Sequence, residues 1–131
     1  MTGLTPYLLF PGTAAEALGF YRDVFGGELI LNTYADFNRP GPADAIAHGM
    51  LKGPVTLFGA DADADEDAVH IVGAFFSLLG TAEPEVLTGW FERLSDGGRV
   101  VDALQERPWG AHDGTVVDRF GIRWLIGYET D

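Results

Sequence analysis

His48 is the residue of this chain whose type and surroundings are best suited to chemistry. Residues 45–51 have the length and composition of a strand, and strand alternation places Ile46, His48 and Met50 on one face. An imidazole titrates near neutral pH, so His48 can act as an acid or base, or contact a ligand in a cleft. A histidine among large apolar residues can equally be a hydrogen-bonded part of the core. Both interpretations stay open, and His48 is the candidate catalytic residue.

Aromatic side chains in two predicted loops can supply the walls of a binding cleft. Trp109 lies in a Pro-Trp-Gly loop, where its ring can stack on a planar ligand and donate one N–H. Tyr34 and Phe37 flank the other long loop and can form the opposite wall. Packing of Trp109 onto the sheet or onto another subunit is the alternative. The sequence therefore predicts a ligand-binding cleft from five residues: Tyr34, Phe37, His48, Met50 and Trp109.

Residues that bind metals are few or badly spaced. The chain has no cysteine, which excludes disulfides, thiolate zinc sites and a cysteine nucleophile. The three histidines lie on different predicted elements and include no short-spaced pair. The acidic run at residues 61–67 imitates the start of a calcium loop, but Glu66 and Val72 stand where an EF-hand needs glycine and glutamate. We predict no metal and no cofactor, and we interpret the acidic run as a solvated loop.

Composition bounds the class of protein. Twenty acidic against eight basic residues give a formal charge of −12, which would repel a nucleic-acid backbone and an anionic membrane. The hydrophobic fraction of 47% is that of a folded globular protein. No apolar run approaches the ~20 residues of a membrane helix, and no signal-peptide pattern is visible. We expect a soluble, cytoplasmic protein without nucleic-acid or membrane partners.

Part of the sequence occurs twice, and this repeat predicts the fold. Residues 16–30 are echoed by residues 85–101, and each copy follows an apolar run. Both copies read as strand, amphipathic helix, Gly-Gly turn and strand. The first helix begins after Thr13, and Glu16 completes a capping-box pattern. The second begins at Pro84, where the first turn tolerates a missing N–H.

The remaining apolar segments complete a βαβββ order in both copies. One helix for each run of antiparallel strands indicates an α+β fold whose sheets carry a helix on one face. The opposite faces of two such sheets can enclose a cleft. We expect one domain of two modules at residues 1–60 and 70–131, joined by an acidic linker at residues 61–69. The predicted strands are residues 5–10, 29–34, 45–51, 55–59, 70–79, 99–104, 115–118 and 122–128.

Short motifs spread over nearly the whole chain carry a family resemblance. They are Pro6-Tyr7-Leu8 with Phe10 and Gly12, Glu16-Ala17 with Phe20-Tyr21, Phe25-Gly26-Gly27-Glu28, Ile46 with His48 and Leu51, Trp109-Gly110, and Asp118 with Phe120-Gly121 and Trp124. In these motifs and in its repeat the chain resembles the vicinal oxygen chelate superfamily of glyoxalase I, extradiol dioxygenases and bleomycin-resistance proteins. The motifs resemble most the PhnB-like branch, also called 3-demethylubiquinone-9 3-methyltransferase-like. The chain has no glycine-rich nucleotide-binding loop followed by a ribose-binding acid, so we do not predict methyltransferase activity.

The resemblance also implies where a metal would be held. Enzymes of the superfamily bind a divalent ion through His and Glu from the first and last strands of each module. Alignment on the aromatic and glycine anchors puts residues without side-chain ligands at all four positions: Pro6, Leu57, Gly73 and Leu125. A register shifted by one residue brings no better set: Thr5, Thr56, Val72 and Trp124 or Ile126.

Three hypotheses for function follow. The first is a protein that binds a small planar or hydrophobic molecule in a metal-free cleft. The second is an isomerase, lyase or dioxygenase of the same superfamily that uses a metal or is assisted by His48. The third is a structural or regulatory dimer with a vestigial cleft. The resemblance implies a homodimer, formed by modules paired side by side or exchanged between chains.

Overall fold

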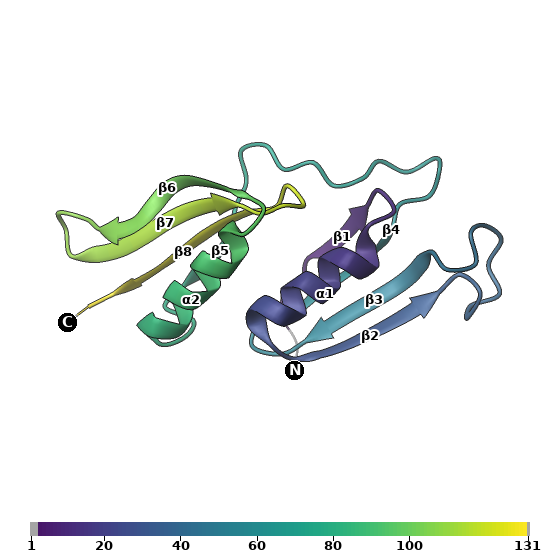
Figure 1. Ribbon diagram of the computed structural model, residues 1–131, viewed down its shortest axis with the longest axis horizontal. Coiled ribbons are helices and arrows are strands. Elements are labelled where there is room, and N and C mark those ends of the chain that lie inside the picture. The colour runs from purple at the N-terminus through teal and green to yellow at the C-terminus, as the bar shows by residue number, and fades with distance from the viewer. Residues whose placement is uncertain (1–2, 131) are drawn as a thin grey trace. The chain divides into compact units, whose positions relative to one another are not determined.

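The chain folds into two units of the same architecture. In the computed structural model, which describes residues 3–130, the first unit ends at Val69 and the second begins at His70. Each unit consists of a four-stranded sheet and one helix (Figure 1). The predicted α+β class and the βαβββ order of both modules are confirmed.

The first sheet has the strand order β1-β4-β3-β2. Strand β1 runs parallel to β4, whereas β4, β3 and β2 pair antiparallel. The parallel pair places the first and last strands of the unit side by side. The elements of this unit are β1 (Tyr7–Phe10), α1 (Ala14–Phe25), β2 (Glu28–Thr33), β3 (Ile46–Lys52) and β4 (Leu57–Asp61).

The second sheet repeats this topology in the order β5-β8-β7-β6, with β5 parallel to β8. The predicted strand at residues 70–79 is too long, because β5 begins only at Phe76. Gly73 has a φ of 72°, a left-handed conformation that interrupts extended backbone. The elements of this unit are β5 (Phe76–Leu79), α2 (Pro84–Ser95), β6 (Arg99–Glu106), β7 (Ala111–Val117) and β8 (Arg123–Glu129).

Helix α1 covers one face of the first sheet and leaves the other face open. Leu18 and Tyr21 are completely buried on the apolar stripe of the helix, which contacts β2, β3 and β4. The sheet makes room at Gly49, where an added Cβ would lie 2.5 Å from Leu18 Cδ1. Gly49 therefore faces the helix, and its neighbours His48 and Met50 point to the opposite face, which we call the open face.

Helix α2 covers the second sheet in the same way. Leu87, Trp90 and Leu94 are buried on the helix, and Trp124 and Ile126 are buried on β8, which the helix contacts. Trp90 and Trp124 therefore belong to the core of this unit. Each helix has 12 residues, and within residues 3–130 no helix is long and apolar enough to cross a membrane.

Asp61, not the predicted capping box, caps the N-terminus of α1. Thr13 occupies the N-cap position, but its side chain makes no capping hydrogen bond. Instead Asp61 Oδ1 accepts a hydrogen bond from the backbone N–H of Ala14 at 2.9 Å, and Oδ2 accepts one from that of Ile46 at 2.8 Å. The capping box of Thr13 and Glu16 is therefore a wrong prediction, because a carboxylate from β4 accepts from the first N–H of the helix instead.

The same residue corrects the interpretation of the acidic run as wholly solvated. Asp61 is the last residue of β4 and is only 9% exposed. Residues 63–67 are exposed, as predicted for the rest of the run. A carboxylate can be buried here because each of its oxygens accepts a backbone hydrogen bond.

Asp118 organises the turn between β7 and β8. Its side chain is buried, and Oδ1 accepts hydrogen bonds from the backbone N–H groups of Phe120 at 2.8 Å and Ile122 at 3.2 Å. Its other oxygen, Oδ2, accepts one from Trp124 Nε1 at 2.8 Å. The carboxylate therefore joins the turn to the core.

Candidate functional site

A row of side chains crosses the open face of the first sheet. The strand register pairs Tyr7 of β1 with Phe58 of β4, and Phe58 with Met50 of β3. Met50 is in turn paired with Ile30 of β2. Directly paired residues share a face of a sheet, so these four residues form one row, which we call the open-face row. None of them is fully buried, and Tyr7 is 48% exposed.

His48 lies beside this row and is held by two of its aromatic rings. Its Nδ1 is 2.8 Å from the hydroxyl oxygen of Tyr7, and the two rings stack with centroids 5.5 Å apart. Phe58 meets the imidazole edge to face, with centroids 5.8 Å apart. The hydrogen bond and the two ring contacts fix the orientation of the imidazole, which stays partly exposed.

The hydrogen bond between Tyr7 and His48 sets the chemistry of the imidazole. A phenol O–H is a stronger donor than an imidazole N–H, so we take Tyr7 as donor and His48 Nδ1 as acceptor. The ring proton of neutral His48 is then on Nε2, which can donate to a ligand. Burial raises the pKa of Tyr7 above its ordinary value of 10.0, which keeps the phenol protonated at neutral pH.

We expect the stability of the protein to fall in alkali in a way that depends on Tyr7. Because the pKa of Tyr7 is higher in the folded than in the unfolded chain, its contribution is complete below pH 10.0 and is lost as the pH rises through the folded-state pKa. Urea unfolding at a series of pH values should show a steeper alkaline loss of stability for the wild type than for Tyr7→Phe. Equal slopes for the two proteins would contradict this expectation.

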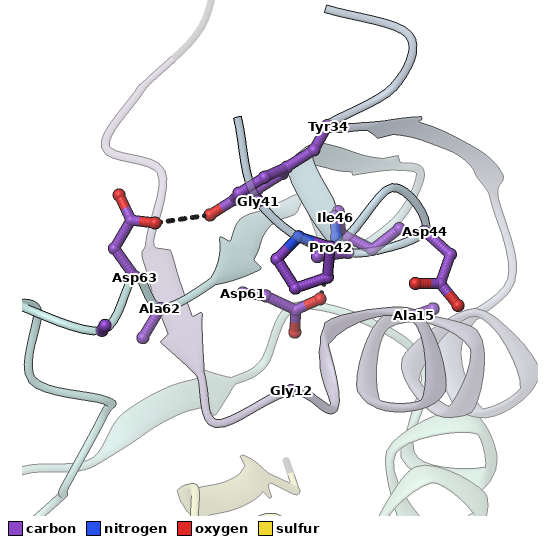
Figure 2. A pocket seen from close by; sticks show the side chains of 12 residues that line it. Gly12, Ala15, Tyr34, Gly41, Pro42, Asp44, Ile46, Asp61, Ala62 and Asp63 are labelled. Atoms are coloured by element: carbon purple, nitrogen blue, oxygen red, sulfur yellow. Dashed lines mark hydrogen bonds between the residues drawn. The ribbon is translucent and has the colours of Figure 1, made fainter. Parts of the chain in front are cut away.

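Tyr34, another predicted cleft residue, lies in a different setting. It is 3% exposed, and its hydroxyl donates to Asp63 Oδ1 at 2.9 Å, as Figure 2 shows. Arg39 lies over the Tyr34 ring at 4.2 Å and donates to the other oxygen of Asp63 at 3.1 Å. The hydrogen bond to Asp63 raises the pKa of Tyr34, because loss of its proton would leave two neighbouring anions. These contacts tie the loop after β2 to the acidic run.

A cavity of about 540 Å³ lies beside Tyr34, at the end of the sheet where α1 begins (Figure 2). Its walls include Ala15 of the helix, Pro42 of the loop after β2, and Asp61. His48, Met50 and Phe37 are not among the residues that line it. The structure thus places Tyr34 at this cavity and His48 with Met50 on the open face. Phe37 lies in the loop after β2 and is 49% exposed.

Trp109 lies in the second unit, in the hairpin between β6 and β7. The turn is closed by a hydrogen bond from the Gly110 N–H to the Arg107 carbonyl at 2.9 Å. Trp109 is 74% exposed, whereas Trp90 and Trp124 are buried. A joint cleft of Trp109 and His48 stays a prediction, since the two residues belong to different units.

The residues at the expected metal positions do not fit a metal. Leu57 is 1% exposed in the core, Leu125 carries a hydrocarbon side chain on β8, and the other two positions are Pro6 and Gly73. Divalent ions of the family's kind need oxygen or imidazole ligands, which none of these side chains offers. Within residues 3–130, no group of three or more His, Cys, Asp or Glu side chains is placed to hold a metal ion.

Sequence reasoning missed Tyr7 and Phe58 as members of the site. Alternation within β1 separates Tyr7 from the buried Leu8, but the strand has only four residues. The parallel pairing of β1 with β4 brings Tyr7 to the open face beside Phe58, and this long-range pairing leaves no local signal. The sequence signal that could have found them is the repeat itself, since it implies equivalent first and last strands in each module.

Comparison with known proteins places these features in a family. The model of the Glyoxalase/Bleomycin resistance protein/Dioxygenase superfamily matches residues 3–126. Protein YjdN of Escherichia coli K12 is 29% identical, over 94% of this chain and 92% of its own. The crystal structure of protein PA1353 from Pseudomonas aeruginosa is 30% identical, with a TM-score of 0.81 and complete coverage of both chains. A PhnB protein from Bacillus cereus, described as a putative 3-demethylubiquinone-9 3-methyltransferase, shares the fold at 22% identity, with a TM-score of 0.79 and coverage of 97% of this chain and 99% of its own.

Proposed function

The chain belongs to the Glyoxalase/Bleomycin resistance protein/Dioxygenase superfamily, and we propose that it binds a small planar molecule on the open face of its first sheet. The observation that carries this proposal is His48, held by Tyr7 at 2.8 Å yet partly exposed beside apolar side chains. A binding site of this kind is mostly apolar and has a few oriented polar groups.

Membership of the superfamily confirms the superfamily resemblance drawn from the sequence motifs. The PhnB protein from Bacillus cereus shares the fold. Membership alone does not decide a reaction, because one fold carries many activities. The homodimer that the resemblance implies stays a prediction.

The open-face row determines the shape and polarity of the proposed ligand. Phe58 and Met50 offer adjacent apolar surfaces on neighbouring strands, against which a flat ring can lie. His48 Nε2 offers one N–H donor at the edge of that surface. The ligand class that satisfies both is a neutral planar compound with a carbonyl or hydroxyl oxygen at its rim. The formal charge of −12 disfavours an anion.

A pair of probes that differ in one property tests this proposal. Coumarin has a planar body with a carbonyl acceptor, and naphthalene has a similar body without one. We expect coumarin to shift the NMR signals of the Tyr7, His48 and Phe58 rings and to bind more tightly than naphthalene. His48→Ala should weaken coumarin binding about tenfold, or ~1.4 kcal/mol, because it removes both the donor and ring contact.

Two further variants separate the site from general effects on the protein. Tyr7→Phe leaves the ring stack and removes the hydroxyl, so coumarin should bind about threefold to fivefold more weakly, as expected for one hydrogen bond. Ser77→Ala, at an exposed position on β5 of the other sheet, should bind coumarin like the wild type. The proposal fails if His48→Ala binds coumarin unchanged, or if neither probe perturbs the three rings.

A further inference from the structure

The second unit has two hollows that meet at a stacked pair of rings. His112 of β7 and Tyr128 of β8 are direct partners in the strand register. Their rings are almost parallel, with centroids 4.8 Å apart and an interplanar angle of 11°. A hollow of about 330 Å³ lies between this pair, α2 and β6. A second hollow, of about 440 Å³, adjoins the same pair beside Leu79 at the end of β5.

His112 has a polar atom that lacks a partner. Among the described residues, none forms a hydrogen bond with its Nδ1, and that atom is buried. Buried polar atoms are almost always hydrogen-bonded, so an exception calls for an explanation. Rotation about the last side-chain torsion of histidine is soft, so a small turn of the ring can present Nδ1 to a group in the hollow. The Nδ1 atom is therefore able to accept a hydrogen bond from a group outside this chain.

The charged side chains that line the two hollows are all carboxylates. Glu92 of α2 lines the smaller hollow, and Asp113 and Glu129 line the larger. Asp113 is already paired with Arg107 at 2.8 Å, whereas Glu92 and Glu129 are exposed. No lysine or arginine is among the residues that line either hollow. A ligand that matches this lining must donate hydrogen bonds and carry positive charge.

The apolar part of the lining suits a flat body. Phe91 of α2 and Leu104 of β6, the strand next to β7, also line the smaller hollow. An ammonium near aromatic faces gains a cation–π attraction in addition to its pairing with a carboxylate. Ammonium N–H groups are donors only, so they complement the carboxylates and the Nδ1 acceptor of His112.

We propose that the crevice between α2 and the His112–Tyr128 pair is a binding site for a small aromatic ammonium compound. The ammonium group lies near Glu92 and donates to Nδ1 of His112, and the aromatic body lies against Phe91 and Tyr128. This site is on the helix-covered side of the second sheet, and its ligand class differs from that proposed for the first. The two proposals can therefore be tested independently, and failure of one does not affect the other.

Three probes that share a phenyl ring and differ in charge test the proposal on the full chain. Benzylamine is an ammonium at neutral pH, benzyl alcohol is neutral, and benzoate is an anion. We expect benzylamine to shift the ring nitrogen signals of His112 and the ring signals of Tyr128. Benzyl alcohol should bind about tenfold more weakly and benzoate should not bind. Coumarin should not compete with benzylamine, because the site proposed for coumarin is on the first sheet.

Variants distinguish this site from a general attraction of cations to an acidic protein. Glu92→Gln should weaken benzylamine binding about threefold, as expected for an exposed ion pair, while Glu16→Gln on α1 should leave it unchanged. His112→Phe keeps a ring opposite Tyr128 and removes Nδ1, so it should bind benzylamine about fivefold more weakly. Equal effects of the two glutamate variants, or equal affinity for benzylamine and benzyl alcohol in the wild type, would overturn the proposal.

Discussion

Replacement of Asp118 by alanine is expected to lower the free energy of unfolding by about 3–5 kcal/mol, the largest loss that we predict for a single residue. The buried carboxylate accepts three hydrogen bonds, two from the backbone of its own turn and one from the Trp124 indole. Alanine would take this acceptor away from all three donors, and Ile122 and Trp124 are fully buried. Global stability is typically ~5–15 kcal/mol, so the loss should be large in thermal and urea unfolding.

Two companion variants show where this stability originates. Trp124→Phe removes one donor and keeps an aromatic ring, so the loss from Asp118→Ala should be smaller in that background. Asp23→Ala removes an exposed carboxylate of α1, whose pairing with Arg22 at 3.6 Å is on the surface, and should change stability by less than ~1 kcal/mol. If Asp118→Ala lowered the free energy of unfolding no more than Asp23→Ala, the Asp118 carboxylate would not be what stabilises the turn.

The fold could be predicted because its signals are local and repeated. Helix α1 follows from apolar residues at helical spacing, including Leu18 and Tyr21, which the structure buries completely. The Gly26-Gly27 and Gly97-Gly98 pairs mark the end of each helix region before β2 and β6. A short sequence that repeats this pattern has few alternatives to two α+β modules. The predicted start of the β5 strand at residue 70 is wrong, because the apolar run begins before the residues that pair with another strand. The strand β5 begins only at Phe76.

The candidate site could be predicted only in part, because its contacts join residues far apart in the sequence. Alternation in β3 correctly separates His48 and Met50 from Gly49, which faces the helix. Alternation does not show that Tyr7 is the partner of His48, since that contact depends on the parallel pairing of β1 with β4. The ring of Tyr34 predicts a place in the cleft wall, yet its hydroxyl donates to Asp63 in another loop.

The burial of acidic residues also depends on contacts between distant residues. The sequence alone therefore does not distinguish a solvated carboxylate from a buried one. Asp61 and Asp65 belong to one acidic run and have the same side chain. One is 9% exposed and accepts two backbone hydrogen bonds, while the other is exposed. The difference arises from the position of Asp61 at the end of β4, beside free backbone donors of α1 and β3. Only the tertiary pairing of these elements brings donors to the carboxylate.

We expect Asp61→Ala to lower the free energy of unfolding by about 2–4 kcal/mol. Removal of the carboxylate takes away the cap from the Ala14 N–H and leaves the Ile46 N–H, at the start of β3, without its partner. The negative charge also lies at the positive end of the α1 dipole, which adds to its stabilising effect. Because Asp61 joins three elements of the first unit, the loss should be seen in urea unfolding and as faster hydrogen exchange at the start of α1.

Asp65→Ala is the matched control within the acidic run, and it should change stability by less than ~0.5 kcal/mol. Thr13→Ala tests the alternative cap and should also have a small effect, because the Thr13 side chain makes no capping hydrogen bond. A larger loss for Thr13→Ala than for Asp61→Ala would restore the capping box that the sequence predicts. We expect a much larger loss of stability for Asp61→Ala than for Thr13→Ala or Asp65→Ala. That result would establish that the last residue of β4 holds α1 in place. That link fastens the helix to the back of the sheet whose open face carries Tyr7, His48 and Phe58.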